Sequence, residues 1–204
     1  MRNNTQVLIV RHGETKLLQK DRIHGQLDSP LSPKGISDAH KTAARLSSEH
    51  FDVLYCSPLG RARQTAAIIG EPLGLEPIPV HGLQERSYGW LEGKKLSWFE
   101  PDESGPRILL PIVRLSLKLS GEDPQEMVLR TIDAFETIIS NHLHQRILIV
   151  AHWGTLSILK LYLDGSDTSM WRSVGPWTAC SITEYHKNGS DWHPVHIDAA
   201  DHLS

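Results

Sequence analysis

Two histidines stand directly after short apolar runs of this sequence. Residues 7–10 lead into Arg11-His12-Gly13, and residues 147–150 lead into Ala151-His152. A neutral imidazole is an effective nucleophile when its second ring nitrogen is held as a hydrogen-bond donor. Arg11 has the fork of donors that binds two phosphate oxygens, and Gly13 allows the backbone to approach the ring and a phosphate closely. These residue types suit phosphoryl transfer, although a histidine at a strand end is by itself more often structural.

Phosphoryl transfer also requires positive groups around the equatorial oxygens and an acid for the leaving alkoxide. The sequence contains basic and carboxylic side chains that could serve, Arg61 and Glu85 among them. Each has a simpler explanation when taken alone, because Arg61 could cap a helix and Glu85 could be a solvated residue of an exposed loop. The hypothesis therefore depends on whether the fold brings these residues to His12 and His152.

The strands that would position these residues are short, apolar and bounded by polar turns. Such runs occur at residues 7–10, 53–56, 77–80 and 147–150. Residues 180–185 and 194–197 predict a terminal hairpin around a turn at 187–189. Arg11 and His12 then lie at the carboxyl end of one strand, and His152 lies at the carboxyl end of another.

Helical periodicity alternates with these strands. Helices are expected over residues 33–46, 61–69, 124–143 and 155–163. Ser32-Pro33 provides an N-cap and a first-turn proline for the first helix, and Asp123 opens a capping-box-like start for the third. The alternation predicts one α/β domain over residues 1–204, a three-layer α/β/α fold with a mostly parallel sheet and helices on both faces. Ligands of such sheets bind beyond the carboxyl ends of the strands, where both histidines fall.

The least regular segment covers residues 102–119, within a possible flap or insertion at about 94–122. Its apolar residues between Leu109 and Leu117 follow no clean period. Three interpretations stay open for it: a flap over the site, a surface for self-association into a homodimer, or a buried irregular insertion.

Five segments, taken in order along the chain, carry residues that suit phosphoryl transfer. They are Arg11-His12-Gly13-Glu14-Thr15; residues 25–35; residues 57–65 with Arg61; Leu83-Gln84-Glu85 followed by residues 89–93; and Val150-Ala151-His152-Trp153-Gly154-Thr155. Together they resemble the histidine phosphatase superfamily, which includes cofactor-dependent phosphoglycerate mutases, sugar bisphosphatases and α-ribazole phosphatases. The match runs from residue 7 to about residue 165, and five ordered parts are far more specific than any one of them.

The resemblance implies a role for each candidate residue. It implies that His12 forms a phosphohistidine, that Glu85 protonates the leaving oxygen and later activates water, and that Arg11, Arg61 and His152 bind the phosphoryl group. Physical chemistry agrees, because a nearby dianionic phosphate favours the protonated forms of Glu85 and His152. Such acid catalysis is typically worth about a hundred- to ten-thousand-fold in rate. No cofactor and no metal are implied.

Two departures bear on the substrate. Leu18 stands where the mutases of this family have an asparagine that contacts substrate, and Trp153 stands where they usually have a glycine. Both changes make the rim of the site more apolar or narrower. The mutases also have a longer insertion after the Glu85 region and a C-terminal tail that shields the phosphoenzyme, whereas this chain ends soon after Ile197. The expected activity is therefore hydrolysis of small phosphate monoesters, with mutase-type transfer as the alternative.

Several residues are candidates for substrate contact. Gly13, Thr15, Gly25, Gln26 and Trp153 lie within the matching motifs. Thr15 and Gln26, together with Thr155, are equally well explained as turn or cap residues. Trp90, Trp98, Phe99 and Trp153 could form an aromatic wall for a substrate that contains a ring, or could simply pack. The identity of the phosphate ester is not determined by the sequence.

Other phosphoryl-transfer and metal chemistries fit less well. The spacing from Cys56 to Arg61 is one residue short of a cysteine-phosphatase loop, and no Gly-rich loop with a lysine is present for a nucleotide. The many histidines form no metal-ligand motif of known spacing. A non-catalytic phosphate-binding or interaction module remains an alternative, although anion binding alone would not require Glu85.

Composition places the protein among ordinary small enzymes. Its 204 residues include 21 basic and 24 acidic side chains, and the formal charge of -3 argues against nucleic acid as a partner. Cys56 and Cys180 are too few for a disulfide framework, so a cytoplasmic location is expected. No run approaches the roughly 18 to 20 apolar residues of a membrane span, which predicts a soluble protein without a membrane partner.

Overall fold

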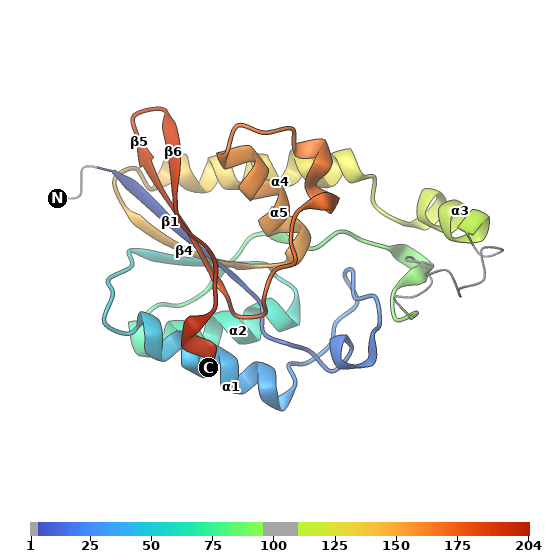
Figure 1. The fold of residues 1–204 in the computed structure, drawn as a ribbon, viewed down its shortest axis with the longest axis horizontal. Coiled ribbons are helices and arrows are strands. Elements are labelled where there is room, and N and C mark those ends of the chain that lie inside the picture. Colours follow the sequence, from blue (N-terminus) through green and yellow to red (C-terminus); the bar gives the residue numbers. More distant parts are fainter. Residues whose placement is uncertain (1–3, 96–109) are drawn as a thin grey trace.

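A single mixed sheet runs through the middle of the molecule, in the strand order β3-β2-β4-β1-β5-β6 (Figure 1). The computed structural model describes residues 4–95 and 110–204. Its strands are β1 (Thr5–Arg11), β2 (Val53–Cys56), β3 (Ile78–Pro79), β4 (Arg146–Ala151), β5 (Ile182–Asn188) and β6 (Asp191–Ala199). Strands β1 to β4 pair in parallel, and β5 and β6 add an antiparallel edge. The expected mostly parallel sheet and terminal hairpin are confirmed.

Helices cover both faces of this sheet. They are α1 (Pro33–Leu46), α2 (Gly60–Gly70), α3 (Leu110–Ser120), α4 (Pro124–Asn141) and α5 (Trp153–Leu163). Ser32 caps α1 by accepting a hydrogen bond from the amide of Gly35, and Asp123 caps α4 by accepting from the amide of Gln125. The expected end of the third helix was wrong, because α4 stops at Asn141 and leaves Leu143 59% exposed.

The alternation of side chains along the central strands produces two apolar layers. Val7 and Ile9 of β1 contact α4 and α5, whereas Leu8 and Val10 contact α1 and α2. Strand β4 alternates in the same way. Figure 1 shows α4 and α5 on one side of the sheet and α1 and α2 on the other. The three-layer α/β/α architecture follows from this pattern and is confirmed.

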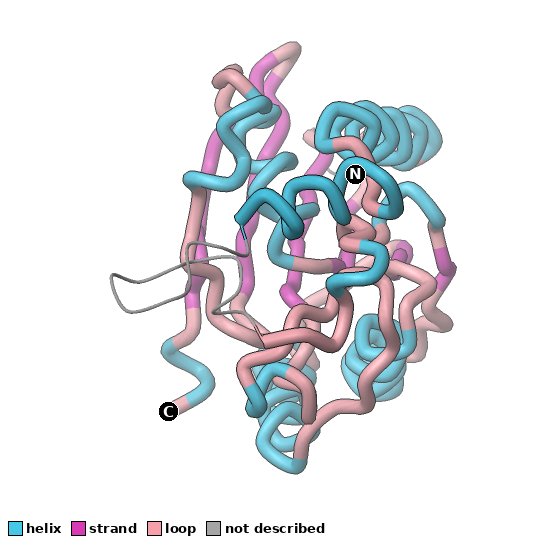
Figure 2. The backbone as a smooth tube through the Cα atoms, turned by 90° about the vertical axis from the view of Figure 1, so that its right-hand side faces the viewer, coloured by secondary structure: helices cyan, strands magenta, loops and turns pink. Residues whose placement is uncertain are grey.

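Part of the segment at 94–122 is helical. Residues 110–120 form α3, in which Leu115 and Leu119 are exposed and Leu117 packs against Ile23 and Leu91. Figure 2 shows the backbone from the side at which the loops gather. Residues 96–109, which include Trp98, Phe99 and Leu109, lie outside the described residues.

The parallel strand pairing determines where the candidate residues meet. Arg11 of β1 is paired with Ala151 of β4, so His12 and His152 leave the same edge of the sheet side by side. Strand β2 lies on the other side of β4 and leads into α2, which begins with Gly60 and Arg61. No helix among the described residues is long and apolar enough to cross a membrane.

Candidate active site

His12 is held with one ring nitrogen bonded to the backbone and the other directed at Arg61. The Nδ1 atom lies 2.8 Å from the carbonyl oxygen of Gly13, and the Nε of Arg61 donates to His12 Nε2 over 3.2 Å. This pattern fits the neutral tautomer with the proton on Nδ1 and the lone pair on Nε2. Burial of the ring, together with the charges of Arg61 and Arg11, holds the pKa of His12 well below its usual value of 6.5. The ring is therefore neutral at physiological pH, and the lone pair of Nε2 faces Arg61.

Arg61 is buried and anchored at the start of α2. Its two terminal nitrogens donate to the carbonyl oxygens of Gly25 at 2.7 Å and Leu27 at 3.2 Å. Burial lowers the pKa of Arg61 to about 10, so the guanidinium stays charged at neutral pH. Gly25 has a φ of +54°, and a Cβ there would lie 2.3 Å from a carboxylate oxygen of Glu92. Glycine is required for the loop to approach both Arg61 and Glu92.

Arg11 and His152 each have a buried nitrogen without a hydrogen-bond partner among the described residues. These atoms are Nε of Arg11 and Nδ1 of His152. Arg11 also donates to the carbonyl oxygen of Trp177, and His152 Nε2 lies 2.7 Å from the hydroxyl of Ser57. The rings of His152 and His12 are 5.0 Å apart. Because an unpaired buried donor is costly, the two nitrogens suit an anionic ligand next to His12.

The protonation of His152 depends on that ligand. Burial and the charge of Arg61 hold the pKa of His152 well below 6.5 in the protein without an anion. A bound phosphoryl group acts in the opposite direction, because a nearby negative charge favours the imidazolium.

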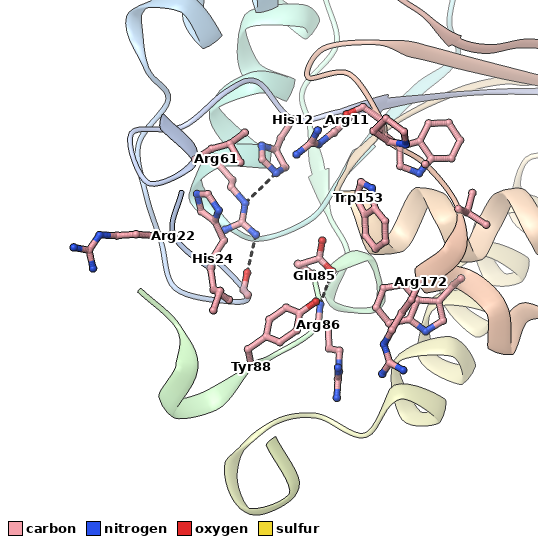
Figure 3. Close-up of a pocket in the computed structure, with 18 of the residues that line it drawn as sticks. Arg11, His12, Arg22, His24, Arg61, Glu85, Arg86, Tyr88, Trp153 and Arg172 are labelled. Atoms are coloured by element: carbon pink, nitrogen blue, oxygen red, sulfur yellow. Dashed lines mark hydrogen bonds between the residues drawn. The ribbon is translucent and has the colours of Figure 1, made fainter. Parts of the chain in front are cut away.

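Glu85 is oriented by two backbone amides. Its Oε1 accepts from the amide of Arg86 at 2.8 Å, and its Oε2 accepts from the amide of Gly154 in the first turn of α5 at 3.1 Å. A Cβ at Gly154 would lie 2.5 Å from Oε1, so a glycine is needed for this approach. Figure 3 shows the carboxylate directed into the cavity, below Arg11 and beside Trp153. Glu85 is positioned to exchange a proton with a group bound at Arg11, His12 and Arg61.

A cavity of about 860 Å³ joins these residues. The predicted residues that line it are Arg11, His12, Gly25, Arg61, Glu85 and Trp153. Leu18 also lines it, as expected for an apolar rim. His152 is fully buried and is not part of the lining.

Gly13, Thr15 and Gln26 also lie outside the cavity lining, and their hydrogen bonds are internal. The amide of Gly13 donates to the hydroxyl of Thr65 at 3.0 Å, and the hydroxyl of Thr15 bonds to a ring nitrogen of His24. The side-chain nitrogen of Gln26 donates to the carbonyl oxygen of Glu85 at 3.2 Å. These residues position the site residues instead of facing the cavity.

Sequence reasoning missed several lining residues. They are Arg22, His24, Arg86, Tyr88, Arg172, Trp171 and Trp177. His24 and Arg86 lie next to the matching motifs, so proximity to Gly25 and Glu85 was a usable signal, whereas the segment from Trp171 to Trp177 has no periodicity that would reveal it. Trp90, considered for an aromatic wall, is 68% exposed and does not line the cavity.

The described residues contain no group of three or more histidine, cysteine, aspartate or glutamate side chains placed to hold a metal ion. Cys56 and Cys180 are both buried, and burial raises the pKa of each thiol, to about 11 for Cys56 and to about 12 for Cys180. Neither cysteine is among the described residues that line the cavity.

Comparison with known proteins finds similar sequences and a similar solved structure. A metal-independent phosphoserine phosphatase of Arabidopsis thaliana is 32% identical over 194 residues, covering 92% of this chain and 79% of the relative. A probable phosphoglycerate mutase, GpmB, of Erwinia tasmaniensis is 32% identical over 188 residues, covering 92% and 87%. The solved structure of YhfR from Bacillus stearothermophilus superposes with a TM-score of 0.85 at 26% identity, covering 98% of this chain and 100% of that one.

A family model matches residues 7–199, which is nearly the whole chain. The matched range includes His12, Arg61, Glu85 and His152, and the fold agrees with that of the solved relative. This chain belongs to the histidine phosphatase superfamily, branch 1.

Proposed function

We propose that this protein is a phosphatase that hydrolyses small phosphate monoesters through a phosphohistidine on Nε2 of His12. The observation that carries the proposal is the hydrogen bonding of His12, because Gly13 holds the proton of Nδ1 and leaves the Nε2 lone pair beside Arg61. A nucleophile, two guanidinium groups and a carboxylate face one cavity. Phosphoryl transfer without a metal requires this set of groups.

The first half-reaction transfers the phosphoryl group to the protein. Nε2 of His12 forms a bond to phosphorus while the bond from phosphorus to the ester oxygen breaks, and Glu85 gives its proton to the leaving alkoxide. Arg11, Arg61 and His152 stabilise the negative charge on the equatorial oxygens. The donors of Arg11 and His152 that lack partners gain them in this step.

The second half-reaction releases phosphate. Glu85, now a carboxylate, takes a proton from water, and the water oxygen bonds to phosphorus as the bond to Nε2 breaks. His12 returns to its neutral form and Glu85 to its acid form, so the cycle closes without a cofactor.

Hydrolysis is favoured over mutase-type transfer by the rim of the cavity. Leu18 and Trp153 both line it, so the rim is apolar and narrower where the family's mutases have a substrate-contacting asparagine and a glycine. One relative is named a phosphoserine phosphatase and another a probable phosphoglycerate mutase, so both activities occur among similar proteins. Transfer to a second phosphate acceptor is the alternative function.

The test is to trap the intermediate. The protein is mixed with a chromogenic phosphate monoester, quenched in base and analysed as an intact mass, since phosphohistidine survives base and is lost in acid. We expect one added phosphoryl group on His12, phosphate release that a chelator does not reduce, and loss of both signals in His12→Ala. Glu85→Gln should slow alkyl phosphates by about a hundredfold or more and nitrophenyl phosphate less, because nitrophenolate leaves without a proton.

Two outcomes would contradict the proposal. Phosphorylation of another residue, with His12→Ala still active, would remove the nucleophile. Stoichiometric binding of the ester without phosphate release would instead favour the non-catalytic module.

A further inference from the structure

Glu85 lies in a stretch of chain without regular secondary structure. Residues 84–88 belong to no helix or strand, so the hydrogen bonds of a helix or a sheet do not fix their backbone. The position of this backbone matters for the site, because the amide of Arg86 donates to Oε1 of Glu85 at 2.8 Å. The contacts that hold this stretch therefore also determine where the Glu85 carboxylate lies.

One guanidinium group holds the stretch. The Nη1 atom of Arg130, on α4, donates to the carbonyl oxygens of Gly82 at 2.8 Å and Gln84 at 2.9 Å. Its Nη2 atom donates to the carbonyl oxygen of Glu85 at 3.2 Å. Backbone carbonyl groups away from water need such partners where no helix or strand provides them. Arg130 thus takes the place of backbone pairing around Glu85.

Glu122 binds the remaining donors of the same guanidinium group. Its carboxylate oxygens accept from Nε of Arg130 at 2.5 Å and from Nη2 at 2.9 Å. The same carboxylate accepts from the amide of Ser87 at 3.2 Å, and the amide of Glu122 donates to the carbonyl oxygen of Ser87 at 2.9 Å. All five N–H groups of Arg130 are therefore bonded, and the chain is held both before and after Glu85.

Helix α4 lies close enough for these contacts because residue 82 is a glycine. A Cβ at Gly82 would lie 2.3 Å from the Cβ of Ala134 and 2.7 Å from the carbonyl oxygen of Arg130. The side chains of Arg130 and Glu122 are partly buried, with 24% and 14% of their surfaces exposed. Bidentate pairing of an arginine with a carboxylate fixes the geometry of both groups. The loop of Glu85 therefore lies directly on a rigid support.

We propose that Arg130, paired with Glu122, is a positioning residue for proton transfer by Glu85. Neither Arg130 nor Glu122 is among the described residues that line the cavity, so their influence on the reaction passes through the loop of Glu85. This inference rests on the proposed phosphatase activity, in which Glu85 gives a proton to the leaving alkoxide and later takes one from water. A small displacement of a reacting group is enough to slow such a step.

The experiment compares two esters that differ in their need for an acid. An alkyl phosphate requires a proton on its leaving oxygen, whereas nitrophenyl phosphate releases nitrophenolate without one. The value of kcat/KM is measured for each, because it reports the steps up to release of the alcohol and not the later hydrolysis of the phosphohistidine. Arg130→Gln should lower kcat/KM by about tenfold or more for the alkyl phosphate and by about threefold or less for nitrophenyl phosphate.

The second half-reaction provides an independent measurement. A displaced Glu85 activates water poorly, so the phosphohistidine should be hydrolysed more slowly in Arg130→Gln. During turnover of nitrophenyl phosphate, intact mass after a base quench should therefore show a larger phosphorylated fraction than in the unaltered protein. A loss of folded protein alone would reduce the amount of active protein and leave the phosphorylated fraction of that protein unchanged.

Further variants grade the effect. Arg130→Lys keeps the positive charge but has three donors and no planar fork, so its loss on the alkyl phosphate should be smaller than that of Arg130→Gln. Glu122→Gln removes one partner of the pair and should change the two esters in the same direction as Arg130→Gln. Added to Glu85→Gln, Arg130→Gln should lower kcat/KM by less than about twofold, because no acid remains to be positioned.

Arg146→Gln is the matched control. The side chain of Arg146 is 13% exposed and forms ion pairs with Glu49 and Glu184 at the start of β4, the end of the strand opposite His152. Its loss should destabilise the fold, which thermal unfolding of each variant measures. Arg146 is not among the described residues that line the cavity, so the ratio of kcat/KM for the two esters should stay as in the unaltered protein.

The outcomes separate this inference from the proposed function. Equal losses on the two esters in Arg130→Gln, or losses that add fully to those of Glu85→Gln, would overturn the positioning role and leave the phosphatase intact. If Arg130→Gln does not fold, the same comparison of esters in Arg130→Lys and Glu122→Gln decides. If Glu85→Gln itself slowed both esters equally, Glu85 would not be the acid, and the proposed mechanism would fail together with this inference.

Discussion

Burial decides the charge state of the histidines at the site. His12 and His152 are almost completely buried and lie beside Arg61, so their pKa values fall well below 6.5 and both rings stay neutral without a ligand. For His12 this is the form that the proposed mechanism requires. A nucleophilic imidazole in this environment keeps its lone pair under mildly acidic conditions, where an exposed histidine would be protonated.

At His24, the lowering of a histidine pKa by burial can be measured through the stability of the protein. Burial lowers the pKa of His24 from 6.5 to about 3, so below pH 6.5 the unfolded chain binds a proton that the folded protein does not bind until about pH 3. The free energy of unfolding should therefore fall as the pH drops from 6.5 towards 3. Between pH 6.5 and 5 this one group costs about 2 kcal/mol. The free energy of unfolding is measured with urea at pH 7 and at pH 5. Between these pH values it should fall by about 2 kcal/mol less in His24→Gln than in the unaltered protein.

The comparison needs phosphate-free buffer, because a bound anion would favour protonated rings and stabilise the folded state. His40→Gln, at an exposed position of α1, serves as the control substitution. An identical loss of stability in His24→Gln and in the unaltered protein would show that His24 has no such role.

At the scale of elements, the contact between the end of β1 and the start of α1 keeps His12 in place. A Cβ at Gly13 would lie 2.7 Å from the carbonyl oxygen of Gly35, and a Cβ at Gly35 would lie 2.1 Å from that of Glu14. Both obstacles are backbone atoms, which cannot move aside as a side chain does. Two glycines therefore allow the loop after His12 to lie directly on the N-terminus of α1.

Gly35→Ala should separate these two elements. We expect a loss of about 1 to 3 kcal/mol in the free energy of unfolding, because an inserted methyl group forces the backbone to shift. The value of kcat should fall by about tenfold or more, since small displacements of a reacting group are costly. Denaturant unfolding and steady-state kinetics measure the two effects.

Lys34→Ala, one residue earlier, is the control. Its side chain is 64% exposed and its ion pair with Asp38 spans one helical turn, so the stability should change by about 1 kcal/mol or less. If Gly35→Ala changed the free energy of unfolding and kcat no more than Lys34→Ala does, the close backbone contact would not constrain the site.

The regular elements were predictable because their signals are local. Ser32 before Pro33 marked the start of α1, and the apolar runs at 7–10 and 147–150 marked β1 and β4. Helix α3 was not predicted from its apolar residues. Leu115 and Leu119 are exposed while Leu117 is partly buried. Among residues 115–120, the part of the helix whose burial is described, the apolar side chains do not share one buried stripe.

At the scale of the whole molecule, an anion in the cavity would link segments that are distant in the sequence. Arg11 and His12 follow β1, Arg61 begins α2, and His152 precedes α5. One ligand bound by all of them stabilises the entire fold, because binding to the folded state alone shifts the unfolding equilibrium. The self-association suggested for the segment at 94–122 and the cytoplasmic location remain predictions.

Inorganic phosphate should therefore raise the melting temperature. At about one hundred times its dissociation constant, a ligand adds about 2.7 kcal/mol, which corresponds to roughly 5 to 10 °C for a domain of this size. Scanning calorimetry with increasing phosphate measures the shift. Arg61→Ala should abolish it, since Arg61 is the guanidinium that contacts His12.

Chloride at matched ionic strength is the control for general salt effects. If chloride raised the melting temperature as much as phosphate does, phosphate would not bind at the proposed site. The same would follow if phosphate raised the melting temperature of Arg61→Ala as much as that of the unaltered protein.

The sequence by itself determined the architecture and named the main candidate residues of the site. Strand and helix periods depend on neighbouring residues, so the alternation that places His12 and His152 at one sheet edge is readable along the chain. The ordered motifs with Arg61 and Glu85 then identified the family.

Only the tertiary structure decided which nitrogen of His12 is available, which donors lack partners and which side chains form the far wall of the cavity. Arg172 and Trp171 lie far along the chain from Arg86 and Tyr88, yet all four line one cavity. No periodic pattern in the sequence shows that these residues lie together, because their contact depends on how the loops pack above the sheet. Charge state follows the same rule, since a pKa responds to burial and to neighbours in space, and these come from the complete fold.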